Sequence, residues 1–146
     1  MKPVYKMEKI SFSYIFLQQK KDLIKDLTFE ILPGEIISII GPESCGKATI
    51  LALICGLLEP THGYMFCNNI HIGYMLQNGD IFQWHNVYRN FSKTFNNNPK
   101  SQNIFDISKS DNCCTINSSS KCCIKKASLI KTLSSEPDLL LLDEPF

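Results

Sequence analysis

The chain of 146 residues is long enough for one domain with a hydrophobic core, and 44% of its residues are hydrophobic. Its formal net charge of +1 gives no electrostatic reason to expect a nucleic-acid partner. The polar N-terminus lacks the apolar core of a secretory signal, and no apolar run approaches the roughly 18 residues needed to cross a bilayer. If the protein works at a membrane, we therefore expect it to dock onto a spanning partner without inserting itself.

The first segments of the chain have the patterns of strands. Tyr5 and Phe12 lie in the first predicted strand, and residues 27–31 alternate apolar and polar side chains, as a half-buried strand does. Residues 36–40 form a short run that is rich in isoleucine and ends at a glycine. Such a run predicts a parallel strand that is buried on both faces.

A glycine-containing turn follows, and then a helix. The apolar residues between 47 and 58 have helical spacing, and Pro60 cannot continue that helix. The turn, Gly-Pro-Glu-Ser-Cys-Gly-Lys over residues 41–47, matches the phosphate-binding pattern G-x-x-x-x-G-K. The strand–turn–helix context favours this interpretation over a glycine turn that merely has a lysine nearby.

This turn carries the predicted chemistry. Its glycines allow the backbone to curl so that successive N–H groups point at one anion, and the helix N-terminus adds positive potential there. Lys47 brings a full charge to the β- and γ-phosphates of a nucleotide, so we expect ATP as the cofactor. The predicted nucleotide-binding residues of this segment are Gly41, Pro42, Glu43, Ser44, Cys45, Gly46, Lys47, Ala48 and Thr49.

One position departs from the pattern. Ala48 stands where a Ser or Thr hydroxyl would bind Mg²⁺. Thr49 is the next residue, but one step around a helix is about 100°, so its hydroxyl should point elsewhere. We hypothesise that ATP binding survives while metal placement suffers, which the Mg²⁺-dependent ATP affinity of Ala48→Ser would test.

The second half of the chain changes in composition. Residues 96–121 are rich in Asn, Ser and Lys, which predicts a loop. Leu139–Leu142 again has the pattern of a buried parallel strand, and two acids follow at its C-terminal end, where open α/β sheets bind ligands. We expect Asp143 to hold Mg²⁺ and Glu144 to orient or deprotonate an attacking water. The alternative is an exposed acidic loop.

Seven cysteines are many for this length, but their odd number and scattered positions do not indicate a disulfide framework. We therefore expect free thiols in the reducing cytosol. The adjacent pairs Cys113-Cys114 and Cys122-Cys123 lack Cys-x-x-Cys spacing, which favours packed or solvated thiols over a metal site.

Several stretches together resemble the nucleotide-binding subunit of an ABC importer, closest to the nitrate, sulfonate, taurine and bicarbonate group. They are SFSY at 11–14, LPGE at 32–35, GLLEPTHG at 56–63, GYMLQ at 73–77 and IFQWHNVYRN at 81–90, together with the phosphate loop and residues 128–146. The resemblance implies that Tyr14 stacks on adenine, with a core-facing tyrosine as an equal alternative. It makes Gln77 the residue that senses the γ-phosphate and Mg²⁺, and Phe82 and Trp84 contacts to a permease.

The same resemblance implies an α/β fold of the P-loop NTPase type. It would have an N-terminal antiparallel β portion and a mostly parallel core sheet, incomplete at the C-terminus. The predicted portions are 1–75 with the phosphate loop, 76–123 with the glutamine loop and signature region, and 124–146 with a helix and the acidic strand end. The implied partners are transmembrane permease subunits and a second copy in a head-to-tail dimer, at the cytoplasmic face of the cell membrane.

Two departures from the family stand out. An LSGGQ-type signature of one family subunit caps the ATP of the other, but positions 119–123 retain only Ser120, with Lys121 and Cys122 replacing two glycines. The family also continues beyond the acidic strand into a strand that lies between those at 36–40 and 139–142. Without it, we expect either that these two strands pair with each other or that the chain is unstable alone.

Three functions remain open at this point. The first is an ATPase subunit that energises an importer, with Lys47, Gln77, Asp143 and Glu144 in the roles given above. The second is a nucleotide-binding remnant that turns over little ATP. Ala48 and the altered signature would each remove a catalytic part, and so would the lack of the switch histidine to which the family's next strand leads. The third, a GTPase or kinase of another P-loop class, is weakest because the chain has no Asn-Lys-x-Asp motif.

Overall fold

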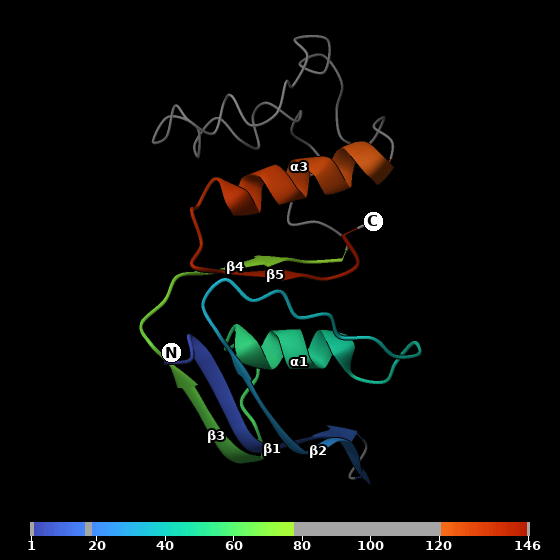
Figure 1. The fold of residues 1–146 in the computed structure, drawn as a ribbon. Coiled ribbons are helices and arrows are strands. Elements are labelled where there is room, and N and C mark those ends of the chain that lie inside the picture. The colour runs from blue at the N-terminus through green and yellow to red at the C-terminus, as the bar shows by residue number, and fades with distance from the viewer. Residues whose placement is uncertain (1, 17–18, 78–120, 146) are drawn as a thin grey trace, which may run out of the picture. The chain divides into compact units, whose positions relative to one another are not determined.

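The computed structural model describes residues 2–16, 19–77 and 121–145, and the chain divides into two compact units, Met1–Ile70 and His71–Phe146. Figure 1 shows the elements of each unit. The first unit contains strands β1, β2 and β3 and helix α1, and the second contains strands β4 and β5 and helix α3. Each unit therefore contains both strands and a helix, as expected for an α/β chain.

Three antiparallel strands form the sheet of the first unit, in agreement with the antiparallel β portion that the family resemblance implies, although only the first two were expected from their residue patterns. They are β1 (Tyr5–Phe16), β2 (Gln19–Ile31) and β3 (His62–Cys67), in the order β2-β1-β3. Buried side chains of the sheet and of the helix build the core of this unit, which includes Tyr5, Met7, Ile10, Phe12, Ile24, Ile31, Leu53 and Ile54. The alternating apolar pattern thus places one face of the sheet against apolar side chains.

A bulge bends the central strand β1. Its pairing with β3 shifts between Glu8 and Ser11, and Lys9 adopts a positive φ of 50°. Gly63 lies opposite with a φ of 95°, and a Cβ on it would come within 2.4 Å of the Lys9 carbonyl oxygen. Only glycine fits this close approach of two backbones.

Burial also changes the acidity of one core residue. Removal from water raises the pKa of the Tyr5 phenol to about 12, and the nearby Cys67 and Cys55 thiols add to the effect. The folded state therefore favours the neutral phenol. This contribution to stability is complete below pH about 10 and is lost as the pH rises towards about 12.

Helix α1 (Lys47–Ile54) begins where the sequence predicts but ends four residues before Leu58. Gly56 has a φ of 74°, its N–H donates to the Leu53 carbonyl (3.0 Å), and the Leu57 N–H donates to the Ala52 carbonyl (2.9 Å). This pair of bonds is a Schellman motif, which stops a helix at a glycine in the left-handed conformation. The expected helix through residue 58 was therefore too long, because Gly56 and not Pro60 ends it.

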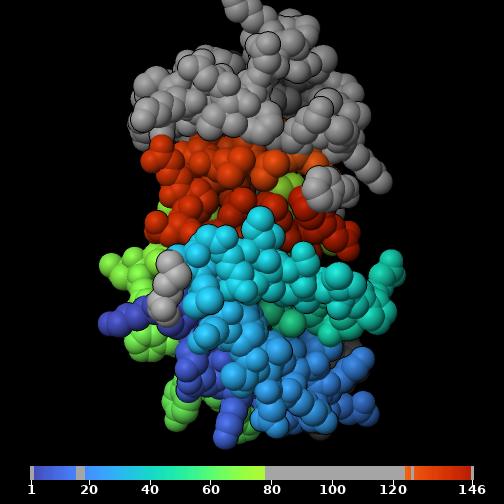
Figure 2. All heavy atoms as spheres, in the orientation of Figure 1, coloured from blue at the N-terminus to red at the C-terminus, as the bar shows by residue number. Residues whose placement is uncertain are grey.

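The predicted buried strand at residues 36–40 is wrong. None of the described strands pairs with this segment, and Ile36 and Ile40 are 94% and 92% exposed. In the space-filling view, the cyan to teal atoms of the chain around these residues form a large part of the visible surface of the first unit (Figure 2). A strand needs neighbours for its N–H and C=O groups, and an apolar run alone does not supply them.

The second unit pairs two parallel strands beneath a helix. Strands β4 (Ile72–Met75) and β5 (Leu139–Leu142) pair in register from Ile72↔Leu139 to Met75↔Leu142. The prediction of a parallel strand at Leu139–Leu142 is confirmed, although Leu142 is 37% exposed and so is not buried on both faces. The predicted mostly parallel core sheet is limited to these two strands within the described residues.

Helix α3 (Lys121–Leu133) covers β4 and starts three residues before the predicted helix at 124. A Cβ on Gly73 of β4 would lie 2.9 Å from the side chains of Pro137 and Thr132. A glycine at this position therefore permits close helix–strand packing. Within the described residues, no helix is both long and apolar enough to cross a membrane.

Candidate functional site

The loop at residues 41–47 curls as a phosphate-binding loop should. Ser44 and Gly46 have positive φ values of 60° and 103°, and Gly46 is the N-cap of α1. Curved backbone of this kind can turn successive N–H groups inward, and a helix N-terminus favours negative charge at the same place. Gly46 is buried, and a Cβ on it would lie 3.2 Å from the Leu23 side chain, so a larger residue would disturb the packing of the loop against β2.

Lys47 closes the loop. Its Nζ donates hydrogen bonds to the carbonyl oxygens of Gly41 (2.9 Å) and Pro42 (2.7 Å), which hold the ammonium across the loop. A Cβ on Gly41 would lie 2.7 Å from Cys45 Sγ, so a side chain at position 41 would crowd the Cys45 side chain. The structure thus brings the predicted lysine and the predicted glycines together in one small, exposed cradle.

Tyr14 lies beside the first turn of α1. Its hydroxyl is 3.4 Å from Thr49 Oγ1, and its ring packs edge-on against Phe12 with centroids 4.8 Å apart. The side chain is 46% exposed, so the alternative of a core-facing tyrosine does not hold. Thr49 itself is buried and its hydroxyl faces Tyr14, while Ala48 is exposed and has no hydroxyl to offer.

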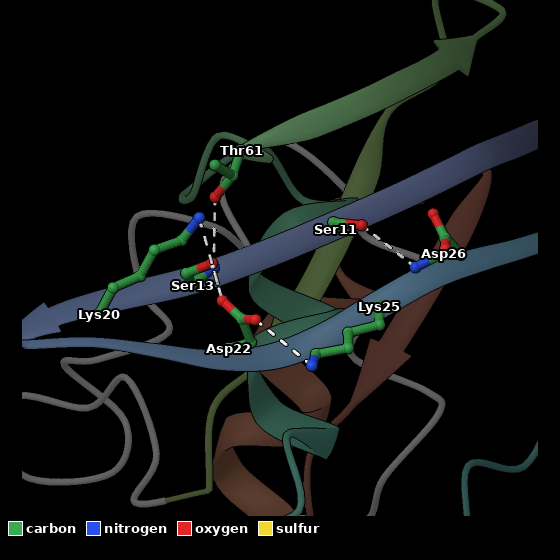
Figure 3. A network of polar contacts seen from close by, with 7 residues as sticks. All are labelled: Ser11, Ser13, Lys20, Asp22, Lys25, Asp26 and Thr61. Carbon is green, nitrogen blue, oxygen red and sulfur yellow. Dashed lines mark hydrogen bonds and ion pairs between the residues drawn. The ribbon is translucent and has the colours of Figure 1, made fainter.

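A polar network fixes the strand pair that carries Tyr14 (Figure 3). The Ser13 backbone N–H donates to the Thr61 hydroxyl oxygen (3.2 Å), and the Ser13 Oγ–H donates to the Asp22 carboxylate (2.9 Å). The hydrogen bond from Ser13, followed by that from Lys25, holds the pKa of the Asp22 carboxyl below its usual value. Because this carboxylate is charged at neutral pH, it can accept from both partners and so pin β2 to β1 beside the tyrosine.

In the second unit, the ends of β4 and β5 bring two predicted residues together. Met75 and Leu142 are the last paired residues, and the Asp143 N–H donates to the Met75 carbonyl (3.1 Å). Beyond them, Gln77 Nε2 donates a hydrogen bond to Glu144 Oε2 (2.6 Å). The two side chains are exposed at the carboxyl ends of parallel strands, the edge at which the sequence predicts chemistry.

The same edge offers oxygen ligands for a divalent cation. Since the amide nitrogen of Gln77 is engaged by Glu144, its amide oxygen and the Asp143 carboxylate remain to bind a metal. Mg²⁺ is typically held by one or two such protein oxygens together with substrate phosphates and waters, so these residues fit it. No cluster of three or more His, Cys, Asp or Glu side chains suited to a metal is found in the described part of the chain.

A further residue at this edge has no signal in the sequence pattern. Lys125 of α3 donates from Nζ to the backbone carbonyl of Glu144 (2.6 Å), and Glu144 adopts a positive φ of 45°. The contact depends on how α3 packs on β4, which residue spacing does not reveal. Lysine on an otherwise unremarkable helix face gave no reason to single it out.

Some predicted residues lie outside the described residues. These are Phe82 and Trp84, the expected permease contacts, and Ser119 and Ser120 of the signature region. Lys121 and Cys122 form the first turn of α3, and nothing is described of their side chains. Their predicted roles stay predictions.

Comparison with known proteins agrees with this geometry. A family model described as "ABC transporter" matches residues 24–146. The uncharacterized ABC transporter ATP-binding protein YtlC of Bacillus subtilis is 29% identical over 161 residues, covering 96% of this chain and 60% of that protein. The taurine import ATP-binding protein TauB of Jannaschia sp. is 30% identical over 141 residues, covering 84% of this chain and 52% of that protein. The chain thus spans about half to three-fifths of these relatives' lengths.

The fold is also similar to a solved structure. The ATP-binding cassette MJ0796, in a dimeric post-hydrolysis state bound to ADP and Pi, matches with a TM-score of 0.84 and 19% identity. The match covers 97% of this chain and 74% of that one. The described elements are therefore those of a mixed α/β fold of the P-loop NTPase type.

Proposed function

This chain belongs to the ABC transporter family, and on that premise we propose that it is an ATP-binding subunit that couples ATP hydrolysis to solute import through a permease. The observation that carries the proposal is the loop at residues 41–47, where backbone curvature, a helix N-terminus and the Lys47 ammonium gather at one point. This combination suits the triphosphate of a nucleotide. The family membership directs the choice of ATP.

Each nucleotide-binding residue then has a role. Apart from Pro42, which has no N–H, the loop residues offer backbone N–H groups that bind phosphate oxygens. Lys47 exchanges its bonds to the loop carbonyls for bonds to the β- and γ-phosphates. Tyr14 offers the exposed part of its ring for stacking on adenine. Its contact with Thr49 supports this role, because it keeps the ring next to the helix that follows the loop.

The residues at the end of β4 and β5 would serve the hydrolysis itself. We assign Glu144 to orient the attacking water and accept its proton as the oxygen bonds to the γ-phosphorus and the bond to ADP breaks. Gln77 holds the Glu144 carboxylate through its amide nitrogen. Asp143 and the Gln77 amide oxygen would hold Mg²⁺, which neutralises phosphate charge when bound.

Equilibrium dialysis with labelled ATP tests the proposal. We expect the wild-type chain to bind ATP and Lys47→Ala to weaken binding at least tenfold, because a charged hydrogen-bond donor to phosphate is lost. Lys2→Ala is the matched control, since it removes an exposed lysine that precedes β1 and lies outside the loop. Equal ATP affinity of the wild type and Lys47→Ala, or no uptake by folded protein, would contradict the proposal.

A second candidate function is a nucleotide-binding protein with little turnover of its own. Ala48 favours it, because this position supplies no hydroxyl to a metal, and so do Lys121 and Cys122, where the family has glycines. An ATPase assay separates the two candidates. ATPase activity of the wild type that disappears in Glu144→Gln supports hydrolysis by this chain. ATP binding by a wild type without ATPase activity, together with a gain of activity in Ala48→Ser, supports the second candidate.

The assembly and the transported solute belong to the same proposal. We expect a head-to-tail pair of cassettes docked on transmembrane permease subunits at the cytoplasmic face of the membrane. The named functions of TauB and the dimeric state of the MJ0796 structure support this arrangement by similarity. By the same similarity, we propose a taurine- or sulfonate-like solute. The pairing of cassettes is tested by sedimentation experiments, in which we expect Glu144→Gln to dimerise when ATP is added.

A further inference from the structure

Glu144 is held in an unusual backbone conformation. Its φ of 45° lies in the left-handed region, which residues with a side chain rarely adopt. Pro145 follows it and disfavours the right-handed helical conformation for the residue before it. Without further contacts, extended backbone would be the ordinary conformation of Glu144. Some interaction must therefore select the left-handed conformation.

Two hydrogen bonds hold Glu144 from different sides. Lys125 Nζ donates to its carbonyl oxygen (2.6 Å), and Gln77 Nε2 donates to its carboxylate (2.6 Å). The first bond comes from helix α3 and the second from the segment after β4. Charged donors make short and strong hydrogen bonds, and Lys125 is partly buried, which restricts its freedom.

The two bonds depend on the same backbone angles. If Glu144 returned to extended backbone, its carbonyl would turn away from Lys125 and its side chain would leave Gln77. We infer that Lys125 is a positioning residue: by binding the Glu144 carbonyl, it keeps the carboxylate aimed at Gln77. The inference rests on the proposed function for its catalytic meaning, because Glu144 is the residue assigned there to the attacking water.

A purely structural role is the rival explanation. In that case, Lys125 would tie α3 to the end of β5 and add stability, but its loss would not change how Glu144 meets Gln77. The side-chain amide of Gln77 can distinguish these explanations, because its NMR resonances report the bond to Glu144 directly. They can be assigned with Gln77→Leu and recorded on protein without nucleotide.

The experiment compares ¹⁵N spectra of single variants. Glu144→Ala gives the position of the Gln77 amide resonances without the bond, and we expect Lys125→Met to move them to that position. Lys125→Arg keeps a charged donor of similar reach and should leave them at the wild-type position. Lys131→Met is the matched control, since it removes a lysine about 9 Å further along the same helix. Should Lys125→Met not fold, Lys125→Ala takes its place.

Unchanged Gln77 amide resonances in the folded Lys125 variant would overturn the inference. The inference would also fail if Glu144→Ala left these resonances unchanged, because the bond between Gln77 and Glu144 would then be absent in solution. If the chain hydrolyses ATP, Lys125→Met should lower kcat roughly tenfold with KM for ATP unchanged, since only the water-orienting group is displaced. An equal loss in Lys125→Arg would also contradict it. Absence of ATP binding would defeat the proposed function but not this comparison, which needs no nucleotide.

Discussion

Two short apolar runs of this chain have nearly the same pattern and different fates. Residues 36–40 contain four isoleucines, and residues 139–142 are four leucines; each precedes a predicted site. Only the leucines form a strand, β5, which pairs with β4 along its whole length. The isoleucines are 37% to 94% exposed and belong to none of the described strands.

The difference shows that an apolar run specifies a strand only together with its neighbour. Isoleucine favours strands more than leucine does, so intrinsic preference would have chosen the other segment. What β5 has instead is β4 beside it, and α3 packs closely on β4 because Gly73 has no side chain. Pairing and cover therefore outweigh the β-propensity of the residues.

Hydrogen exchange gives the largest expected contrast between the two runs. The amides of β4 and β5 that donate across the ladder should exchange roughly 10³-fold more slowly than unprotected amides or slower still. The amides of residues 36–40 should exchange close to the unprotected rate. Exchange would be followed residue by residue by NMR, with the helical amides of α1 as an internal reference from the same unit. Strong protection at residues 36–40 would show that this run is paired in solution and restore the original strand prediction.

The sequence predicts well where the determinants are local. The phosphate loop, the start of α1 and the first two strands follow from residue types at fixed spacing, whereas β3 was not expected and the antiparallel arrangement came from the family resemblance. The early end of α1 was also encoded locally, in Gly56, but its signal competed with that of Pro60. Residues 36–40 could not be placed, because the partner that a buried strand needs is a property of the tertiary structure.

The candidate site divides along the same line. Its loop residues are adjacent in the chain, so the pattern alone brings them together. Gln77 and Glu144 are 67 residues apart and meet only because Met75 pairs with Leu142. Family resemblance named these two residues, but their hydrogen bond and the contact of Lys125 come from register and helix packing. No spacing rule in the sequence contains that information.

Truncation of one side chain in each run should give the next largest effect. Leu141 is 5% exposed, and Leu141→Ala should lower the free energy of unfolding by about 2–5 kcal/mol through lost burial and a residual cavity. Ile40→Ala is the matched change in the other run, and at 92% exposure it should alter stability by no more than about 0.5 kcal/mol. Urea unfolding followed by circular dichroism measures both. Equal losses would mean that Ile40 is buried in solution.

Filling the gap beneath α3 tests whether cover by the helix protects the paired run. A methyl group added by Gly73→Ala would meet Pro137 and Thr132 at 2.9 Å, so helix and strand must separate or distort. We expect a loss of about 1–3 kcal/mol in urea unfolding, as for other overpacked interiors. Gly34→Ala is the comparison in the first unit, because a Cβ there meets nothing within 4 Å and its cost arises from the φ of 77° alone. A larger loss of amide protection in β4 for Gly34→Ala than for Gly73→Ala would contradict the role assigned to the gap.

The smallest expected effect concerns two serines of the helical segment that covers the paired run. Ser128 is 1% exposed, and its hydroxyl has no hydrogen-bond partner among the residues that the structure describes, whereas the buried Ser134 hydroxyl donates to the Ile130 carbonyl (2.8 Å). Ser128→Ala should therefore stabilise the protein by about 1 kcal/mol, because it removes an unsatisfied polar group and raises helix propensity. Ser134→Ala should destabilise by a similar amount, since it deletes a bond that is made. Urea titrations of the two variants measure these changes in the free energy of unfolding. Changes of opposite sign would show that the hydrogen bonds already made, and not the burial of polar groups as such, stabilise the helical segment on the strands. A loss of stability in Ser128→Ala would mean that its hydroxyl finds a partner in solution.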